Sequence, residues 1–161
     1  MLLKRIKYHN FRPFIGDQEI VLTPDDNEDK NVVVILGNNT FGKSTFVLSF
    51  IWCLYGESRF SRKDDILNKK IEAQMKFGQQ ESAIVEVEFE DDNKVYTMTR
   101  TQVFTKGQNN VLNSDRSLAK LTYVTDKGET KSLGTSQATI NEVISAILPK
   151  DLSSFFFFEG E

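Results

Sequence analysis

Residues 37–44 read Gly37-Asn38-Asn39-Thr40-Phe41-Gly42-Lys43-Ser44, and this stretch decides the fold. Its spacing fits the pattern G-x-x-x-x-G-K-[ST], in which a glycine-rich loop leads from a strand into a helix. Both neighbours fit that order: residues 31–36 are rich in β-branched side chains, and residues 44–55 carry apolar side chains at helical spacing. The sequence therefore predicts an α/β fold built around a strand, this loop and a helix.

The residue types of this loop suit phosphate binding. Gly37 and Gly42 allow a tight turn whose backbone N–H groups point inward as a nest for phosphate oxygens. Lys43 would place a compact positive charge against the β- and γ-phosphates, and Ser44 would offer its hydroxyl to Mg²⁺. The N-terminus of the following helix adds roughly half a positive charge through its dipole. The motif is that of the P-loop NTPases, with a chance match as the alternative.

The bulk composition indicates a globular chain. Its 161 residues are 39% hydrophobic and 27% charged, which is enough for one domain with a core. The single cysteine, Cys53, favours a reducing, cytoplasmic location without disulfides. Lys4, Arg5 and Lys7 interrupt the first apolar run, so no signal peptide is expected, and no apolar stretch approaches the roughly 20 residues that span a membrane. The net charge of −3 does not by itself indicate a nucleic-acid binder.

Away from the loop, the pattern predicts an antiparallel β subdomain. Residues 83–90 alternate strictly between apolar and polar side chains, a turn follows, and residues 94–101 return, which indicates a β-hairpin. A second hairpin is expected around Asp126-Lys127-Gly128. The remaining expected strands are an edge or half-buried strand over 2–8, its antiparallel partner over 19–22, and the arms of the second hairpin over 121–124 and 130–133.

Two helices are expected to pack on these strands. The helix over 44–55 should turn Phe46, Phe50 and Leu54, with Val47 and Ile51 beside them, toward the sheet, and Gly56 should end it. A second helix should begin at Thr135 or Ser136 and stop before Pro149. Its apolar positions are Ile140, Val143, Ile144 and Ile147.

Three other stretches complete the prediction. Residues 58–80 are polar and should form a long functional loop with a short helix, and residues 107–116 should be a mobile polar loop. The chain finishes on Phe155-Phe156-Phe157-Phe158-Glu159-Gly160-Glu161, which is expected to be an apolar strand followed by a charged turn. Because a protein would not normally end there, we expect the chain to be a piece of something longer.

Three segments together resemble one group of ATPases. Tyr8-His9-Asn10-Phe11-Arg12-Pro13-Phe14 resembles the Asn-Phe-Arg segment that opens the heads of structural-maintenance-of-chromosomes (SMC) proteins and of the coiled-coil ATPase of the double-strand-break repair nuclease. Trp52-Cys53-Leu54-Tyr55-Gly56 is similar to the Leu-Tyr-Gly that ends the P-loop helix there. The terminal Phe155 to Glu161 resembles the Phe-rich segment of DndD, the ATPase of DNA phosphorothioation systems, and its relatives.

This resemblance implies a fold and a function. Residues 1–161 would be the N-terminal lobe of an ABC-type ATPase head, in which ATP and Mg²⁺ lie between two heads of a homodimer. The C-terminal lobe, a long coiled coil, DNA, and accessory defence or nuclease subunits are the implied partners, and no membrane is. The implied ATP-binding residues are Arg12, Gly37, Asn38, Asn39, Thr40, Phe41, Gly42, Lys43, Ser44 and Thr45, and Mg²⁺ would be held by Ser44 and, through water, by Glu159.

The sequence also departs from that family. Thr40-Phe41 stands where relatives carry Gly-Ser or Gly-Ala, which suggests a wider loop or weaker binding. Glu159 stands at the position of the family's Q-loop glutamine. No Walker B strand with its catalytic glutamate, no Ser-Gly-Gly signature and no switch histidine can be found, so the chain alone is expected to be inactive. Phe155 to Glu159, read as a compact Walker B strand, is the competing interpretation of the terminal segment.

Several alternatives stay open from the sequence. Arg12 could contact a phosphate or form a surface ion pair, and Asn39 could reach a γ-phosphate across a head dimer or only stabilise its own turn. Lys63, Lys69, Lys70 and Lys76 could form a DNA-facing strip, although a solvated loop is the preferred interpretation. The rival functions are a double-strand-break repair ATPase of the same superfamily, a self-contained P-loop kinase or GTPase-like switch, and an interaction module with a degenerate P-loop.

Overall fold

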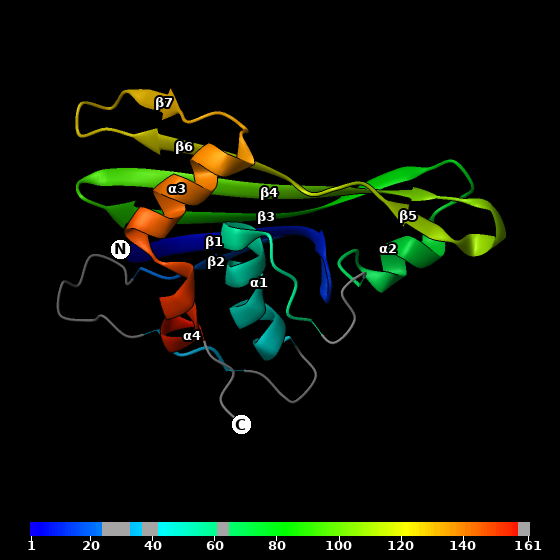
Figure 1. The fold of residues 1–161 in the computed structure, drawn as a ribbon. Coiled ribbons are helices and arrows are strands. Elements are labelled where there is room, and N and C mark those ends of the chain that lie inside the picture. Colours follow the sequence, from blue (N-terminus) through cyan, green and yellow to red (C-terminus); the bar gives the residue numbers. More distant parts are fainter. Residues whose placement is uncertain (24–32, 37–41, 61–64, 158–161) are drawn as a thin grey trace.

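The structure, a computed structural model, describes residues 1–23, 33–36, 42–60 and 65–157 (Figure 1). Its framework is a seven-stranded antiparallel sheet in the order β2-β1-β3-β4-β6-β7, with β5 paired to the end of β4. The strands are β1 (Leu2–Phe11), β2 (Phe14–Val21), β3 (Gln80–Asp91), β4 (Lys94–Lys106), β5 (Leu112–Ser114), β6 (Leu118–Val124) and β7 (Thr130–Ser132). The helices are α1 (Lys43–Tyr55), α2 (Lys69–Gln74), α3 (Gln137–Ile147) and α4 (Ser153–Phe156), with 3₁₀ turns η1 (Gln108–Asn110) and η2 (Lys150–Leu152).

The β3–β4 hairpin confirms the predicted pair of strands and shows why alternation was a reliable signal. Along β3 every second side chain, from Ala83 to Phe89, is buried on the core face. The intervening acidic side chains lie on the open face, where Glu86 and Glu88 form ion pairs with Lys7 and Arg5 of β1. One face is therefore apolar and the other solvated, as expected for an antiparallel sheet covered on one side.

Helix α1 confirms the predicted helix, but its buried surface is wider than a single stripe. Its residues 50–54 are all buried, whereas Phe46 and Val47, which were expected to face the sheet, are only half-buried. The reason is that α1 contacts β3 and β4 and also α3, with Cys53 near its C-terminal end bonded to both strands. Gly56 ends the helix as predicted, with a φ of 72° and its N–H donating to the carbonyl of Trp52 at 2.9 Å.

The strand predicted over 31–36 is not found in the described part of that segment. Residues 33–36 belong to no strand, and Val34 and Leu36 are 71% and 88% exposed. A β-branched run becomes a buried strand only where neighbouring strands supply hydrogen-bond partners. The antiparallel sheet, over its described strands, ends at β2 and β7, so it supplies none to this segment.

The predicted apolar strand at the end of the chain is also wrong over its described residues. Residues 153–156 form the short helix α4, and Phe157 follows it with its ring stacked on Phe50 of α1 at 5.1 Å. The segment is thus anchored as a helical turn on α1. A compact Walker B strand over Phe155 to Glu159 therefore has no support, and Glu159 itself lies outside the described residues.

The other elements refine the sequence predictions. Strand β1 lies between β2 and β3, so it is an interior strand rather than an edge. Helix α2 is the short helix expected within 58–80, and the second hairpin is β6–β7. Residues 107–116 were expected to be a mobile loop, yet they contain η1 and β5. Ser136 is the N-cap of α3, although its side chain makes no capping hydrogen bond.

Candidate nucleotide-binding site

The Asn10-Phe11-Arg12 segment runs from the end of β1 into the turn before β2. Asn10 and Arg12 have left-handed backbones, with φ of 48° and 50°, on either side of the fully buried Phe11. The Phe11 ring packs at 5.1 Å from Trp52 of α1 and at 5.8 Å from Phe60. Buried aromatic packing thus fixes the middle of the turn, and the flanking residues accept a backbone conformation that is uncommon outside glycine.

Residues 65–68 are tied to this turn by backbone hydrogen bonds. The Arg12 N–H donates to the carbonyl of Ile66 at 2.9 Å, and the Asn68 N–H donates to the carbonyl of Asn10 at 2.8 Å. The side-chain amide of Asn68 donates to the carbonyl of Arg12. The turn and the segment leading into α2 therefore form one rigid unit.

The Arg12 side chain reaches the first turn of α1. Its Nη1 donates to the carbonyl of Asp65 at 2.7 Å, its Cζ lies 4.2 Å from the centroid of the Phe60 ring, and its Nε is 3.5 Å from Thr45 Oγ1. Burial lowers the pKa of the guanidinium, while the nearby Asp65 carboxylate acts in the opposite direction. Arg12 is thus a positioned, partly desolvated cation rather than one arm of a loose surface ion pair.

The N-terminus of α1 is built to receive a negative charge. Gly42 precedes the helix with a φ of 96°, and a Cβ at this position would lie 2.9 Å from Pro13 Cγ, so only glycine fits. Lys43 and Ser44 are exposed in the first turn, Thr45 is buried beside Arg12, and no acidic residue lies in that turn. The N–H groups at the start of a helix point out of its first turn, and together with the helix dipole they favour an anion there.

These features meet in a pocket of about 450 Å³. Three of its side chains, Arg12, Lys69 and Lys70, are cationic, and Asp65 is its only acid among the lining residues. The pocket joins the β1–β2 turn, the start of α1 and the start of α2. Its lining residues are Arg12, Pro13, Gly42, Thr45, Asp65, Leu67, Asn68, Lys69 and Lys70.

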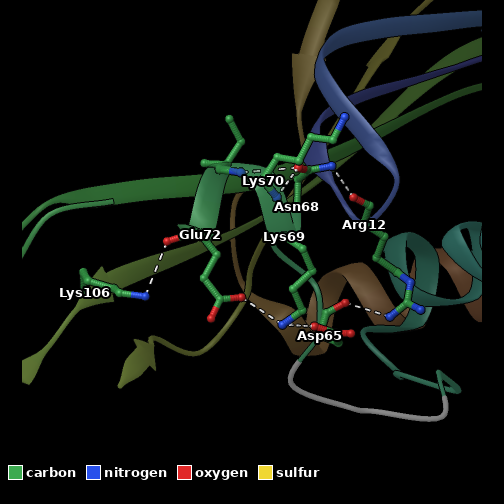
Figure 2. A network of polar contacts seen from close by, with 8 residues as sticks. Arg12, Asp65, Asn68, Lys69, Lys70, Glu72 and Lys106 are labelled. Carbon is green, nitrogen blue, oxygen red and sulfur yellow. Dashed lines mark hydrogen bonds and ion pairs between the residues drawn. The ribbon is translucent and has the colours of Figure 1, made fainter. Parts of the chain in front are cut away.

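A polar network runs from this pocket along α2 (Figure 2). Asn68 caps the helix, because its Oδ1 accepts from the Lys70 N–H at 2.9 Å. Lys69 forms ion pairs with Asp65 and, at 2.8 Å, with Glu72, and these carboxylates raise the pKa of its ammonium. The backbone carbonyl of Glu72 in turn accepts from Lys106 of β4 at 3.4 Å. The network links the pocket to the far end of the β3–β4 hairpin.

A known protein family matches almost the whole chain. The family model for an AAA domain matches residues 5–159. The chain belongs to the AAA domain family. This membership supports an α/β P-loop ATPase domain of the SMC-like, ABC type, with ATP binding as its general function and Mg²⁺ as the usual companion of the nucleotide. No curated protein matches the chain. Within the described ranges, none of the helices is long and apolar enough to cross a membrane.

The structure of this AAA domain brings part of the predicted site together. Gly42, Lys43, Ser44 and Thr45 lie at the start of α1, and Arg12 lies beside Thr45. The other predicted residues, Gly37, Asn38, Asn39, Thr40, Phe41 and Glu159, lie outside the described residues.

Sequence reasoning missed the contribution of α2 to the pocket of this AAA domain. Lys69 and Lys70 were considered only as part of a solvated loop or a DNA-facing strip, yet they line the pocket with Asn68. A signal for the helix was present, because an asparagine directly before a run of helix formers is typical of an N-cap. The proximity of Asn68 to Arg12, 56 residues earlier in the chain, could not be deduced from local pattern.

Proposed function

We propose that this AAA domain is the ATP-binding N-terminal lobe of an SMC-like ATPase head that acts on DNA. The proposal rests on the contact between Arg12 and Thr45 in the first turn of α1. Thr45 directly follows the G-x-x-x-x-G-K-[ST] sequence, whose last two residues begin that helix. Arg12, from one segment that the resemblance singles out, and Gly42, from the other, line one pocket although Gly42 comes 30 positions after Arg12.

Each residue at the start of α1 has a role that follows from its chemistry. Lys43 would contact the β- and γ-phosphates, and the first N–H groups of α1 would hold phosphate oxygens. Ser44 would offer a hard oxygen ligand to Mg²⁺, which shares its remaining positions with water and phosphate. Arg12, held by Asp65 and Phe60, would add a second positive charge without having to be ordered on binding.

Hydrolysis of ATP would need groups beyond those at the start of α1. Phosphoryl transfer needs a positioned water and charge stabilisation from several sides, which the SMC-like resemblance places on a C-terminal lobe and on a second head. Hydrolysis would therefore belong to the complete, dimerised head. The DndD-like terminal segment favours a role in bacterial DNA modification, restriction or antiviral defence, and the repair ATPases of the same superfamily are the alternative.

Calorimetric titration of ATP with Mg²⁺ present tests the nucleotide site. Lys43→Ala should abolish detectable binding, because it removes the charge-assisted contact to the phosphates. Gly42→Ala should weaken binding at least about tenfold, since the new Cβ would collide with Pro13 and displace the start of α1. The matched controls are Lys131→Ala, an exposed lysine on β7, and Gly16→Ala, where a Cβ meets nothing within 4 Å. Equal affinity of wild type and Lys43→Ala would contradict the proposal.

A further inference from the structure

The β3–β4 hairpin extends beyond α2 (Figure 1). A second polar pocket lies at this end of the hairpin. Lys106 ends β4 there, and residues 107–110 turn the chain toward β5. The pocket has a volume of about 450 Å³ and is lined by Phe77, Lys106, Gly107, Gln108, Asn109 and Asn110. We call this the tip pocket; the exposed Lys76 directly precedes Phe77 in the chain.

The ammonium of Lys106 is short of hydrogen-bond acceptors. The residue is only 7% exposed, and within the described residues the one hydrogen bond of its ammonium goes to the Glu72 carbonyl at 3.4 Å. An ammonium carries three N–H donors, and a buried cation is costly unless it is paired or well hydrogen-bonded. The wall of the tip pocket therefore contains a cation that a phosphate or carbonyl oxygen entering the pocket would satisfy.

Phe77 presents its ring on a turn that is firmly held. The ring is 72% exposed, but two backbone hydrogen bonds hold its turn to β4. The Gly78 N–H donates to the Lys106 carbonyl at 2.8 Å, and the Lys106 N–H donates to the Gln79 carbonyl at 3.0 Å. A large apolar side chain on a fixed turn loses little conformational entropy when it meets a flat partner. This ring is therefore a preformed stacking surface.

Three amide side chains complete the wall. Gln108, Asn109 and Asn110 are exposed, and in the described part of the chain their side chains have no hydrogen-bond partner. Asn109 and Asn110 have left-handed backbones, and the turn is closed by the Gly107 N–H donating to the Val111 carbonyl at 2.8 Å. Amides offer both donors and acceptors, which is what the edges of nucleobases require.

The charge around the tip pocket favours an anion. The two stretches that build it, residues 73–80 and 102–114, contain no aspartate or glutamate, although the whole chain has 23 acidic residues and a net charge of −3. Lys76 and Lys106 are the cations of these stretches. A basic partner or a metal cation would find no carboxylate on these stretches, although Glu81, directly after the first of them, accepts from Gln79 at 2.9 Å. A phosphate would meet the exposed Lys76 and, at the wall of the pocket, Lys106.

We propose that the tip pocket binds single-stranded nucleic acid. One base stacks on Phe77, the amides of the η1 turn contact base edges, and Lys106 and Lys76 hold a neighbouring phosphate. A single strand fits better than a duplex because stacking on Phe77 needs an exposed base face, which a duplex covers. This site adds a nucleic-acid contact to the proposed function, and it uses none of the residues of the nucleotide pocket.

Fluorescence anisotropy of a short labelled oligonucleotide, titrated with the full-length protein without ATP, tests the stacking role. Phe77→Ala should weaken binding of the single strand about 5- to 100-fold, the range for losing one stacked base. Phe155→Ala is the matched control, because that ring is 76% exposed on α4 and should leave binding unchanged. The same sequence as a duplex should bind more weakly than the single strand.

The salt dependence of the affinity distinguishes the contribution of the two lysines from that of the Phe77 ring. Lys76→Met, at an exposed position, should reduce the slope of log affinity against log salt by about 0.7, because one phosphate no longer meets an ammonium, and Lys106→Met should do the same. Phe77→Ala should leave that slope unchanged, as should the control Lys131→Met. A melting curve for each variant shows that the fold is kept, and Lys76→Met carries the test if Lys106→Met unfolds.

Three results would overturn the inference: no binding of single strands, equal binding of single strand and duplex, or equal affinity of Phe77→Ala and Phe155→Ala. The two proposals fail separately. Lys43→Ala, which is expected to lose ATP binding, should bind the single strand like wild type. If the wild-type protein binds no ATP but binds single strands in a way that depends on Phe77, the proposed ATPase function is contradicted and the inference about the tip pocket is not.

Discussion

Arg100 on β4 holds the C-terminal end of α1 from inside the protein. The side chain is 1% exposed, and its Nε donates to the carbonyl of Cys53 at 2.9 Å while Nη1 reaches Gln137 of α3 at 3.2 Å. Burial lowers the pKa of the guanidinium. Its positive charge lies at the negative end of the helix dipole, which compensates part of the cost of burial. One side chain thus joins α1, the sheet and α3.

This arrangement predicts that Gly56 tolerates no side chain. Its φ is 72°, and a Cβ would lie 2.9 Å from Nη1 of Arg100. Moving the guanidinium away would weaken the hydrogen bonds that Nη1 donates to Gln137 and Nε donates to Cys53. Gly128 has a similar φ of 77° but nothing within 4 Å, so Gly128→Ala measures the backbone cost alone. We expect Gly128→Ala to cost about 1 kcal/mol and Gly56→Ala at least about 1 kcal/mol more, measured by urea unfolding. Equal losses would show that Arg100 moves aside freely.

Cys53 predicts an alkaline limit to stability. Burial raises the pKa of its thiol from 9.0 to about 12. Between these values the unfolded chain releases this proton and the folded chain keeps it, so the free energy of unfolding falls as pH rises. We expect the urea midpoint of wild type to decrease from pH 9 toward pH 12. Cys53→Ala, whatever its stability at neutral pH, should decrease less steeply, and parallel curves for the two proteins would contradict this origin.

At the level of elements, α2 tests what an N-cap contributes. Asn68 Oδ1 accepts from the Lys70 and Ile71 N–H groups, and Nδ2 donates to Arg12. Asn68→Ala should lower the free energy of unfolding by about 1–2 kcal/mol, because two helix N–H groups and a backbone carbonyl lose their partner. Ser136→Ala at the N-cap of α3 is the control, since its side chain makes no capping bond. Similar losses for the two variants would argue against the cap.

The elements also show what the sequence could and could not predict. The hairpin β3–β4 and the helices α1 and α3 were predictable because alternation and 3.6-residue spacing are local signals. Residues 33–36 and 153–157 share a strand-like composition, but whether such a run pairs depends on neighbours elsewhere in space. In the site, Lys43 and Ser44 follow from a motif. The pocket contacts of Asn68 and Asp65 are made with a turn more than 50 residues away in the sequence, so local sequence patterns could not predict them.

At the scale of the molecule, the most unusual property is an apolar surface beside α1 and α4. It includes the exposed side chains Leu2, Val33, Ile35 and Phe156, and the adjoining residues Val34, Leu36 and Phe155 are exposed as well. Several of them line a groove of about 430 Å³ together with Phe46 and Phe50 of α1. Soluble proteins seldom leave so many large apolar groups exposed together, and such surfaces mark interfaces. We propose that the C-terminal lobe of the ATPase head covers it, which would also give residues 33–36 strand neighbours.

This proposal predicts how residues 1–161 behave when they are produced alone. The exposed surface should bind a hydrophobic dye and cause self-association, and supplying the remainder of the head should suppress both, because burial of apolar area is the main driving force for association. Phe155→Ser with Phe156→Ser should remove most of the dye binding and should prevent association with the remainder of the head. Phe77→Ser is the matched control: its ring is 72% exposed. The residue follows α2, which lies at the opposite end of the protein from α4 (Figure 1), so the variant should leave association intact. If the double variant associates as tightly as wild type while Phe77→Ser does not, the lobe interface lies at the tip of the sheet. That result would also contradict the nucleic-acid site proposed there.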